Sequence, residues 1–528
     1  MVDMRRPSLM ATQPLKVLVW NVHGLNSLAR RNAIRQVVLA ASPTVVCLQE
    51  TKLEPVTVDI IRHCLGNRFE HFYYSPADGT RGGMVITWDA LSVLLHNPHT
   101  TQNTLAALVE LAEAPEWWFT CVYGPQLDQE KVEFLEELVE IRDLHVGPWA
   151  VAGDFNLLVN TSDKNNDAVN RRMLGRFRST LNRLELRELY LSGRIYTWSN
   201  ERQNATLEKI DQVFNTNSWD DLYPSCYLSA LGTSVSDHYP MLLDLHADMH
   251  MGRRFRFESF WPRVEGFMET LSTVWNPVPS AGNPFVILDK KLRATARKLQ
   301  GWSDRWIGNI KMEISMAMEL IYRLDQVVDD RALSTAEIHL RMTLKQKLLG
   351  MCSLERSIAR QRSRLLHLRE GDANTEFFHQ HARQRQRRNM ITSIKKDGQV
   401  ITGHDQIVAK VDGYYNSLLG LASGRGVSLT MENLNLPRWN LSHLEQPFTE
   451  EEVEMVVKLL PPDKALGPDG FTNRLYAFCW NIIKSDPMRA LDAFYRRDVR
   501  GMHAIDKAIV SLLPKVDGTE EIMGLQTC

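Results

Sequence analysis

The stretch Pro148 to Asn156, which reads PWAVAGDFN, constrains the fold of this chain more than any other. Its apolar run, Trp149 to Ala152, has the length of a buried strand. Gly153 ends the run, and Asp154 and Asn156 follow two residues apart, so that in extended backbone their side chains share one side. A carboxylate beside a carboxamide, where a strand opens into a loop, suits metal-assisted attack on a phosphate. Gly-Asp after a strand is also an ordinary turn sequence, so only the rest of the chain can distinguish a catalytic pair from a simple turn.

Polar residues follow several predicted strands in the first half of the chain. Hydrophobic patterning predicts strands at 16–20, 45–49, 83–88, 118–122, 149–152, 210–214 and 241–245, and helices at 30–41, 128–143 and 173–184. Four of these strands end at Asn21, Glu50, Tyr123 and Asp154. In layered α/β folds the ends of strands gather at one rim of the sheet, where sites are built. We therefore expect these side chains to meet. Each of them alone also has a structural explanation, such as a turn cap.

Composition favours an intracellular protein that contacts nucleic acid. Of the 528 residues, 44% are hydrophobic and 24% charged, and no apolar run reaches the roughly 20 residues of a membrane span. The N-terminus lacks the apolar block of a secretory signal. Seven cysteines without a C-x-x-C pair favour free thiols in a reducing compartment over a zinc site. Residues 1–246 hold 22 Lys and Arg against 29 Asp and Glu, whereas residues 355–397 hold 11 against 5. This local basic segment is typical of a nucleic-acid interface or of a solvated helix face.

The motifs of the first half resemble those of the endonuclease/exonuclease/phosphatase superfamily. The resemblance rests on WN-x-x-GLN from Trp20, LQE-T around Glu50, Tyr123, GDFN from Gly153, I-D at Asp211 and SDH from Ser236, in that order. It covers residues 15–245. It implies a four-layer α/β sandwich with a metal at the rim, and hydrolysis of phosphodiester or phosphomonoester bonds with Mg²⁺, or with Mn²⁺ in its place.

The resemblance also implies a role for each motif residue. Glu50 would be the principal metal ligand, with Asn21 beside it and Asp237 close by, an oxygen donor set that suits a hard cation. Among the catalytic residues, Asp154 would orient or deprotonate the attacking water, and Asn156 and Tyr123 would hold the phosphate. His238, oriented by Asp211, would bind the phosphate or assist protonation.

Four further positions qualify this resemblance. Thr197 and Trp198 resemble the loop that lines the nucleic-acid groove, where an aromatic face stacks on a base, although Trp198 could equally be a core residue. His23 stands where close relatives usually have Arg, and Gln212 stands where an Arg often follows the Asp. Because both of the latter positions flank the motifs, we expect them to change affinity more than chemistry.

The second half of the chain has motifs of its own, which resemble segments that follow the nuclease in one class of polyprotein. After a break in composition near residue 247, helical periodicity extends from about 285 to 386. FRFESFW, W-S-x-R-W and REGDANTEFFH resemble the linker of plant LINE-type (non-LTR) retrotransposons, and DKALGPDGF with IVSLLPK resembles the start of their reverse transcriptase. Arg383, Arg385, Arg387 and Arg388 of the basic segment are candidates for binding RNA or DNA backbone. No Y-x-D-D motif occurs, so polymerase activity is not expected.

These observations predict four segments: a polar leader (1–14), a nuclease domain (15–246), a helical basic linker (247–440) and a truncated reverse-transcriptase fingers segment (441–528). We expect the last segment to be mobile or poorly packed, because its partner strands are missing. The predicted function is a Mg²⁺-dependent endonuclease of retroelement origin that nicks DNA, expected in the nucleus, with element RNA as a second partner of the linker. The alternatives are a phosphatase or repair nuclease of the same superfamily, and a decayed fragment that only binds nucleic acid. The oligomeric state and the target sequence are not predicted.

Overall fold

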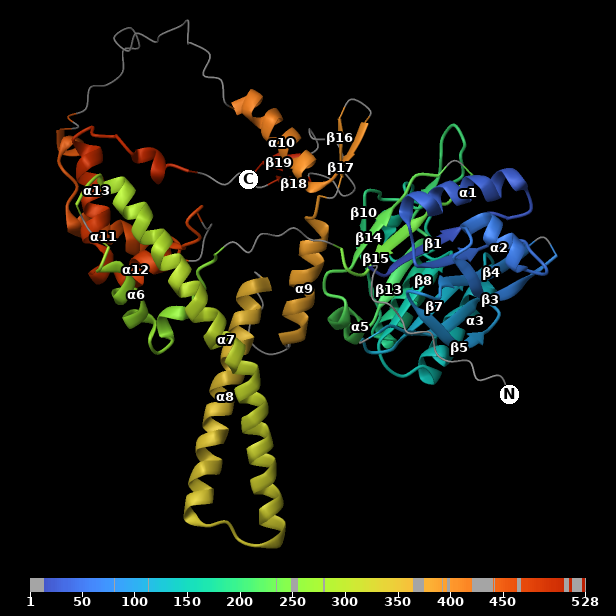
Figure 1. The fold of residues 1–528 in the computed structure, drawn as a ribbon, viewed down its shortest axis with the longest axis horizontal. Helices are drawn as coiled ribbons and strands as arrows, with labels where there is room; N and C mark the ends of the chain where they lie inside the picture. The colour runs from blue at the N-terminus through green and yellow to red at the C-terminus, as the bar shows by residue number, and fades with distance from the viewer. Residues whose placement is uncertain are drawn as a thin grey trace, which may run out of the picture. The chain divides into compact units, whose positions relative to one another are not determined.

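The described part of the chain divides into two compact units. A computed structural model describes residues 14–79, 81–112, 114–233, 235–247, 255–278, 281–363, 375–391, 393–396, 399–419, 440, 442–462, 467–507, 512–514 and 525–527. By contacts, residues 1–250, 383–415 and 512–527 form the first unit, and residues 251–382 and 416–511 form the second. Each unit is described by itself below (Figure 1).

Seven strands form one sheet of the first unit, in the order β10-β14-β15-β1-β2-β4-β3. Their bounds are β1 Lys16–Asn21, β2 Val45–Gln49, β3 Phe69–Asp78, β4 Arg81–Asp89, β10 Leu191–Ser192, β14 Tyr227–Ala230 and β15 Met241–Asp244. β1 and β2 are parallel, with Asn21 opposite Gln49, and β15 is antiparallel to β1.

Six strands form the second sheet, in the order β5-β6-β7-β8-β13-β9. Their bounds are β5 Leu94–Thr100, β6 Thr104–Glu110, β7 Trp117–Tyr123, β8 Trp149–Asp154, β9 Arg187–Glu188 and β13 Asp211–Asn215. β7 and β8 are parallel, and their last residues, Tyr123 and Asp154, lie opposite each other. A separate short ribbon joins β11 Trp198–Ser199 to β12 Leu207–Glu208.

Helices cover the outer faces of the two sheets, and this gives the four predicted layers (Figure 1). Alternate residues of β1 show the arrangement: Val17 and Val19 belong to the core between the sheets, whereas Leu18 and Trp20 pack on the other face. The helices of these layers are α1 Leu28–Ala41 and α2 Val58–Leu65 on the first sheet, and α3 Asp128–Leu144 and α4 Arg171–Arg183 on the second; α5 Asn217–Leu222 precedes β14. The prediction of an α/β sandwich is confirmed.

Helices dominate the second unit. Their bounds are α6 Phe267–Trp275, α7 Pro284–Asp330, α8 Thr335–Ser363, α11 Glu450–Leu459, α12 Asn473–Ile483 and α13 Ser485–Tyr495. At the start of α8, Ser334 Oγ accepts from the Glu337 N–H at 3.3 Å, and the Glu337 carboxylate accepts from the Ser334 N–H at 2.8 Å. This reciprocal pair is the capping box that the sequence indicates.

The segment that resembles the start of a reverse transcriptase is well packed, which corrects the prediction of a poorly packed end. α12 buries Leu475, Cys479 and Ile483 completely, in one apolar core with Trp275 of α6 and Leu299 of α7. The partners that this segment was expected to lack are therefore replaced by the helices of the linker. Residues 463–466, which begin the DKALGPDGF motif, lie outside the described residues.

The remaining elements are α9 Thr375–Arg388, the hairpin β16 Ser393–Lys396 with β17 Gln399–Thr402, α10 His404–Leu419, and β18 Leu512–Pro514 paired with β19 Leu525–Thr527. Most of the REGDANTEFFH motif lies outside the described residues. Among the helices that are described, none is both long and apolar enough to cross a membrane. The six described cysteines are free thiols.

The buried side chain of His145 leads us to expect that the free energy of unfolding changes with pH. His145 is 4% exposed and stacks on Trp118, with 3.6 Å between ring centroids. Burial, with a contribution from His99, lowers the pKa of His145 to about 4. An unfolded histidine titrates near 6.5, so as the pH falls from about 6.5 to 4 the unfolded chain takes up a proton that the folded chain refuses. Stability is therefore lost on acidification through this range.

We expect His145→Phe, which keeps an aromatic ring against Trp118, to reduce this pH dependence. The slope attributable to one such group is at most about 1.4 kcal/mol per pH unit. Urea unfolding of both proteins at several pH values between 7 and 5 measures it. Equal slopes for the two proteins would show that His145 does not titrate in this way.

Candidate active site

The predicted site residues meet at one rim because the strands that carry them are paired within each sheet and the two sheets pack against a shared core. The parallel pairs β1–β2 and β7–β8 end there together. β13 is antiparallel to β8, with Asp211 opposite Asp154. Gly153 has a φ of +147°, and a Cβ at this position would lie 2.1 Å from the carbonyl oxygen of Val122. Only glycine fits here, which explains the first residue of GDFN.

The backbone at this rim is strained. Four non-glycine residues there have positive φ: His23 and Asn156 at about +50°, and Glu50 and Lys52 at +54°. Residues other than glycine are strained at positive φ, and residues strained in this way cluster at functional sites. All four lie directly after β1, β2 or β8.

Asp154 is 1% exposed and is surrounded by donors. Its Oδ2 accepts from Asn21 Nδ2 at 3.0 Å and from Asn156 Nδ2 at 3.4 Å, and its Oδ1 accepts from the Asn156 N–H at 3.0 Å. Burial raises the pKa of Asp154 to about 7, while the charge of His238 acts in the opposite direction. The carboxylate is thus held in one orientation, with a proton affinity suited to a general base.

His238 forms a buried pair with Asp211. Its Nδ1 lies 2.9 and 3.1 Å from the two carboxylate oxygens of Asp211, and its Nε2 lies 3.8 Å from Asp154 Oδ2. Burial opposes the charged form of the ring, but the carboxylates of Asp211 and Asp154 outweigh it and raise the pKa of His238 to about 10. The ring is therefore an imidazolium, with Nδ1 bound to Asp211 and Nε2 facing Asp154.

Two residues outside the predicted set hold His238 in place. Trp20 Nε1 donates to the His238 carbonyl at 3.0 Å. The Ser236 hydroxyl accepts from the His238 N–H at 3.2 Å and donates to the Asn21 carbonyl at 2.8 Å. Sequence reasoning treated both only as parts of a motif, although their places beside Asn21 and Asp237 were a signal of this supporting role.

Asn156 and Tyr123 also lie beside Asp154. Asn156 Nδ2 donates to the Gly124 carbonyl at 2.8 Å, so the loops after β7 and β8 are joined. The Tyr123 N–H donates to the Asn103 carbonyl at 2.9 Å, and its side chain is half-buried. The structure therefore brings both predicted phosphate-binding residues to the carboxylate, and their roles stay predictions.

Glu50 and Asp237, the predicted metal ligands, also lie at this rim, and Nδ1 of His23 is 3.6 Å from an oxygen of each. Asp237 Oδ2 accepts from Trp198 Nε1 at 2.9 Å, whereas its buried Oδ1 has no hydrogen-bond partner among the described residues. Glu50 is 15% exposed at its side chain, and Lys52 Nζ lies 2.9 Å from its Oε1. Two carboxylates with an unsatisfied buried oxygen match the preference of hard cations for oxygen ligands. Asn21 lies nearby but is engaged with Asp154 and with the His23 N–H.

Asp154, Asp211 and His238 are also close enough together to hold an ion, since one ligand atom from each lies within 4.8 Å of the others. Coordination by a histidine needs a free nitrogen lone pair. The carboxylates of Asp211 and Asp154 raise the pKa of His238 and favour the protonated ring, so this group is a candidate for proton and phosphate chemistry as well as for holding an ion.

The predicted nucleic-acid contact of Thr197 needs correction, whereas that of Trp198 stays a prediction. Thr197 is completely buried, and its hydroxyl accepts from the N–H groups of Ile210 and Asp211 at 3.1 and 3.0 Å. It therefore positions Asp211 and cannot line a groove. Trp198 is partly buried and orients Asp237 through its indole nitrogen; stacking on a base stays a prediction for its exposed part.

Two of the four arginines that were predicted to bind nucleic acid make their contacts within the first unit instead. Arg387 is 4% exposed, pairs with Asp220 at 2.7 Å, and donates to the carbonyls of Cys226 and Tyr223. Arg383 pairs with Asp220 and Asp221 at 2.8 and 2.7 Å. Arg387 is therefore not available to a phosphate backbone, and Arg383 is already neutralised. Arg385 is partly buried and Arg388 is exposed, and their role stays a prediction.

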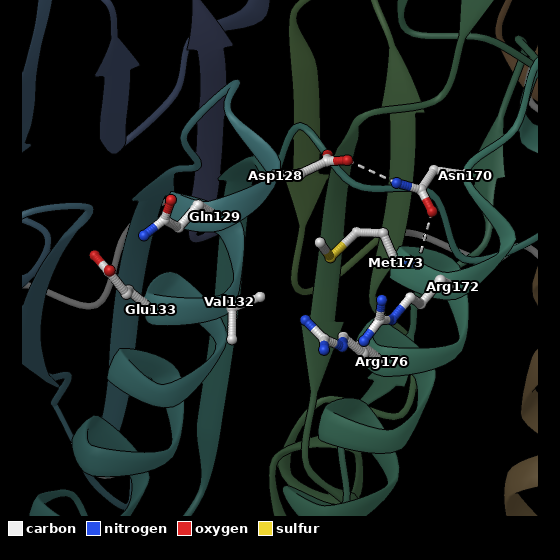
Figure 2. A pocket seen from close by; sticks show the side chains of 8 residues that line it. All are labelled: Asp128, Gln129, Val132, Glu133, Asn170, Arg172, Met173 and Arg176. Atoms are coloured by element: carbon white, nitrogen blue, oxygen red, sulfur yellow. Dashed lines mark hydrogen bonds between the residues drawn. The ribbon is translucent and has the colours of Figure 1, made fainter.

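A groove of about 480 Å³ separates the N-terminal turns of α3 and α4 (Figure 2). Asn170 Nδ2 donates to Asp128 Oδ2 across it at 2.7 Å, and Arg172 and Arg176 of α4 line one side. Its lining includes none of the predicted site residues. The groove is therefore separate from the catalytic cluster.

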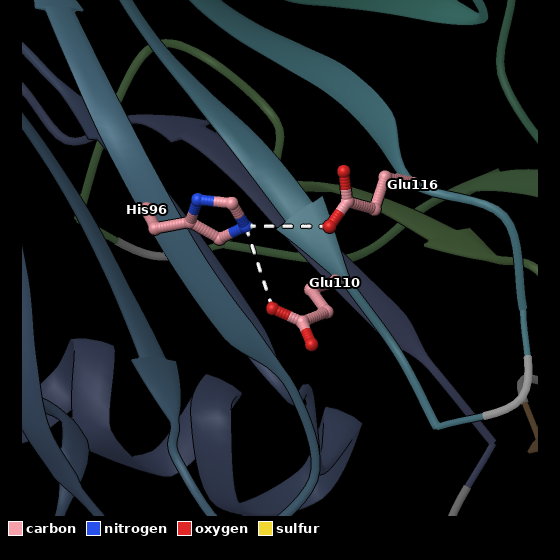
Figure 3. Close-up of side chains that lie close together, drawn as sticks. All are labelled: His96, Glu110 and Glu116. Atoms are coloured by element: carbon pink, nitrogen blue, oxygen red, sulfur yellow. Dashed lines mark ion pairs between the residues drawn. The ribbon is translucent and has the colours of Figure 1, made fainter. Parts of the chain in front are cut away.

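A second group of acidic and histidine side chains lies at the edge of the six-stranded sheet (Figure 3). His96 Nε2 lies 3.5 Å from Glu110 Oε2 and 3.8 Å from Glu116 Oε1. All three side chains are partly exposed, but His96 Nε2, which faces both carboxylates, is itself buried and has no hydrogen-bond partner among the described residues.

Comparison with known proteins finds a family model that matches the part of the chain containing this site. Residues 18–238 match the Endonuclease/Exonuclease/phosphatase family, and this match includes every residue of the site described above. The "Transposon TX1 uncharacterized 149 kDa protein" of Xenopus laevis is 21% identical over 415 residues, which cover 75% of this chain and 31% of that protein. The chain therefore spans about a third of the length of that relative.

Solved structures with similarity include the endonuclease domain of TRAS1, a telomere-specific non-LTR retrotransposon. It is 17% identical, with a TM-score of 0.35, and the match covers 44% of this chain and 98% of that one. The AP endonuclease LMAP from Leishmania major is 19% identical, with a TM-score of 0.33, over 43% of this chain and 86% of that one.

Proposed function

We propose that residues 18–238 form a metal-dependent phosphodiesterase that nicks DNA, within a chain of non-LTR retroelement origin. The observation that supports it most is the arrangement around Asp154. A buried carboxylate lies between two amide donors, Asn21 and Asn156, and faces the imidazolium of His238. A base, donors for a phosphate and a cationic group within a few ångströms of one another are what hydrolysis of a phosphodiester requires.

Each residue of the cluster around Asp154 has its own role in the proposed hydrolysis. Asp154 orients a water and accepts its proton, since it is held rigidly by Asn21 and Asn156. His238 binds a non-bridging phosphate oxygen through Nε2–H, while Asp211 holds Nδ1 and keeps the ring charged. In the complex, Asn156 Nδ2 turns the hydrogen of its long 3.4 Å bond from Asp154 to the phosphate, and the Tyr123 hydroxyl contributes a second neutral donor to the charge that develops there.

Glu50 and Asp237 would hold the divalent cation, with Asn21 at the margin of the site. When bound, the cation supplies positive charge to the phosphate and to the leaving oxygen. Trp198 keeps Asp237 directed toward the site through its indole hydrogen bond of 2.9 Å. Mg²⁺ is the expected ion, with Mn²⁺ as its substitute.

The proposed origin rests on the second half of the chain. Similarity to the TX1 transposon protein covers 75% of this chain, more than the family match alone. The motifs near residues 255–261 and 467–471 resemble the retroelement linker and the start of the reverse transcriptase. From this origin we also propose that the substrate is DNA, that an RNA is a further partner, and that the protein acts in the nucleus.

The test is nicking of supercoiled plasmid by the full chain. We expect relaxation in Mg²⁺ that is abolished by a chelator, and a rate about 10²-fold or more lower in Glu50→Gln, because one anionic ligand is lost. Glu140→Gln, the same change on an exposed face of α3, is the matched control and should behave as wild type. Hydrolysis of phosphomonoesters without nicking would favour a phosphatase instead.

A further inference from the structure

His96, Glu110 and Glu116 meet at the edge of the six-stranded sheet, and none of them belongs to the catalytic cluster (Figure 3). His96 lies on the edge strand β5 and Glu110 is the last residue of β6, whereas Glu116 directly precedes β7. Val109 of β6 lies opposite Trp117 of β7, so the two glutamates come one position further on, where these strands separate. The strand pairing therefore brings the two carboxylates next to each other.

The pleat of β5 turns His96 toward these carboxylates. Leu94 lies opposite Glu110, and residues two apart on a strand point to the same face, so His96 and Glu110 are diagonal neighbours. His96 Nε2 is 3.5 Å from Glu110 Oε2 and 3.8 Å from Glu116 Oε1, and one ligand atom from each of the three lies within 4.8 Å of the others. Two ligands about 2.1 Å from one tetrahedral ion lie roughly 3.4 Å apart, so small side-chain movements let these three atoms share an ion.

The electrostatics of this group call for a further positive charge. Like charges that face each other across a strand pair are destabilising, and among the described residues no Lys or Arg pairs with either glutamate. His96 Nε2 is buried and has no hydrogen-bond partner in the described chain, since hydrogen bonds between nitrogen and oxygen span about 2.7–3.2 Å. A cation between the three groups would satisfy the buried nitrogen and both carboxylates together.

We propose that His96 Nε2 and one oxygen each of Glu110 and Glu116 bind Zn²⁺, with water in the fourth position, and that this ion joins the edge strand β5 to β6 and β7. One imidazole nitrogen with two carboxylates suits Zn²⁺, whereas Mg²⁺ and Ca²⁺ prefer oxygen ligands alone. The Glu116 side chain is 51% exposed, which gives the ion and its water access from solvent. This site is independent of the proposed function.

The test is calorimetric titration of the full chain with Zn²⁺. His96→Phe keeps an aromatic ring on the strand but has no lone pair, and Glu116→Gln removes one charge at an exposed position. We expect both variants to bind this Zn²⁺ about tenfold more weakly or worse, because each loses a ligand. Glu136→Gln, the same change on an exposed face of α3, is the matched control and should bind as wild type does. Any Zn²⁺ held by the catalytic cluster contributes equally, since that cluster is unchanged in every variant.

Visible absorption of Co²⁺, added in place of Zn²⁺, gives a second readout that does not depend on activity. The wild-type chain and Glu136→Gln should show the strong absorption of four-coordinate Co²⁺, and His96→Phe should lose it. Circular dichroism of each variant verifies that the fold is retained, and Glu116→Gln alters only an exposed side chain. If wild type binds no more Zn²⁺ than His96→Phe and the Co²⁺ spectra of the two agree, the site is overturned and the three side chains form an ion pair alone.

Discussion

Replacing Asp154 by Asn is expected to lower the rate of plasmid nicking by about 10³-fold or more, because the variant loses the group that takes the proton of the attacking water. The change is nearly isosteric. An amide at this position can still accept from the Asn156 N–H, which donates to Asp154 Oδ1 at 3.0 Å in the native chain. Single-turnover nicking with saturating Mg²⁺ separates this loss from any change in metal affinity.

Asp143→Asn is the control for this variant, since Asp143 is an exposed residue near the end of α3 and undergoes the same chemical change. It should nick as fast as wild type. A normal rate in Asp154→Asn would remove the base from the proposed mechanism, because no other buried carboxylate touches both Asn21 and Asn156 among the described residues.

Replacing Asp486 by Ala is expected to destabilise the second unit by about 3–5 kcal/mol. Asp486 is 2% exposed, and its Oδ2 accepts from Lys291 Nζ at 2.7 Å and from Trp275 Nε1 at 2.9 Å. Lys291 is itself 3% exposed. Removal of the carboxylate takes away the acceptor that lies 2.7 Å from the buried ammonium and 2.9 Å from the buried indole nitrogen. Urea unfolding followed by circular dichroism measures the loss in this helical unit.

The double variant Asp486→Leu with Lys291→Met distinguishes this mechanism from simple loss of packing. Replacing both charges by apolar side chains also removes the buried positive charge that has lost this carboxylate, so most of the lost stability should return. If the double variant is as unstable as Asp486→Ala, the buried charge is not the cause. The pair joins α7 to α13, so this experiment also tests whether the end of the chain packs on the helical region.

The sequence by itself determined the strands of the first unit that lead to the site and the residues at their ends, but it did not indicate β3, β5 or β6. Trp149–Ala152 and Val45–Gln49 are apolar runs of strand length, and both are strands in the structure. Because the side-chain period and the break at Gly153 are local properties, the side on which Asp154 and Asn156 lie could be predicted without knowledge of any other segment. Packing of the two sheets, one with β1 and the other with β8, then brought Asn21 to Asp154, as the rim argument expected.

Only the tertiary structure decided what the other polar residues do. Thr197 and Arg387 look like surface residues in the sequence, yet each is buried because a distant backbone supplies its partners: the N–H groups of Ile210 and Asp211 for Thr197, and the carbonyl of Cys226 for Arg387. Likewise, the packing of α12 against α6 and the place of His23 beside Asp237 depend on contacts between residues about 200 positions apart. Local periodicity holds no information on such pairings, since they are set by which surfaces meet when the chain is folded.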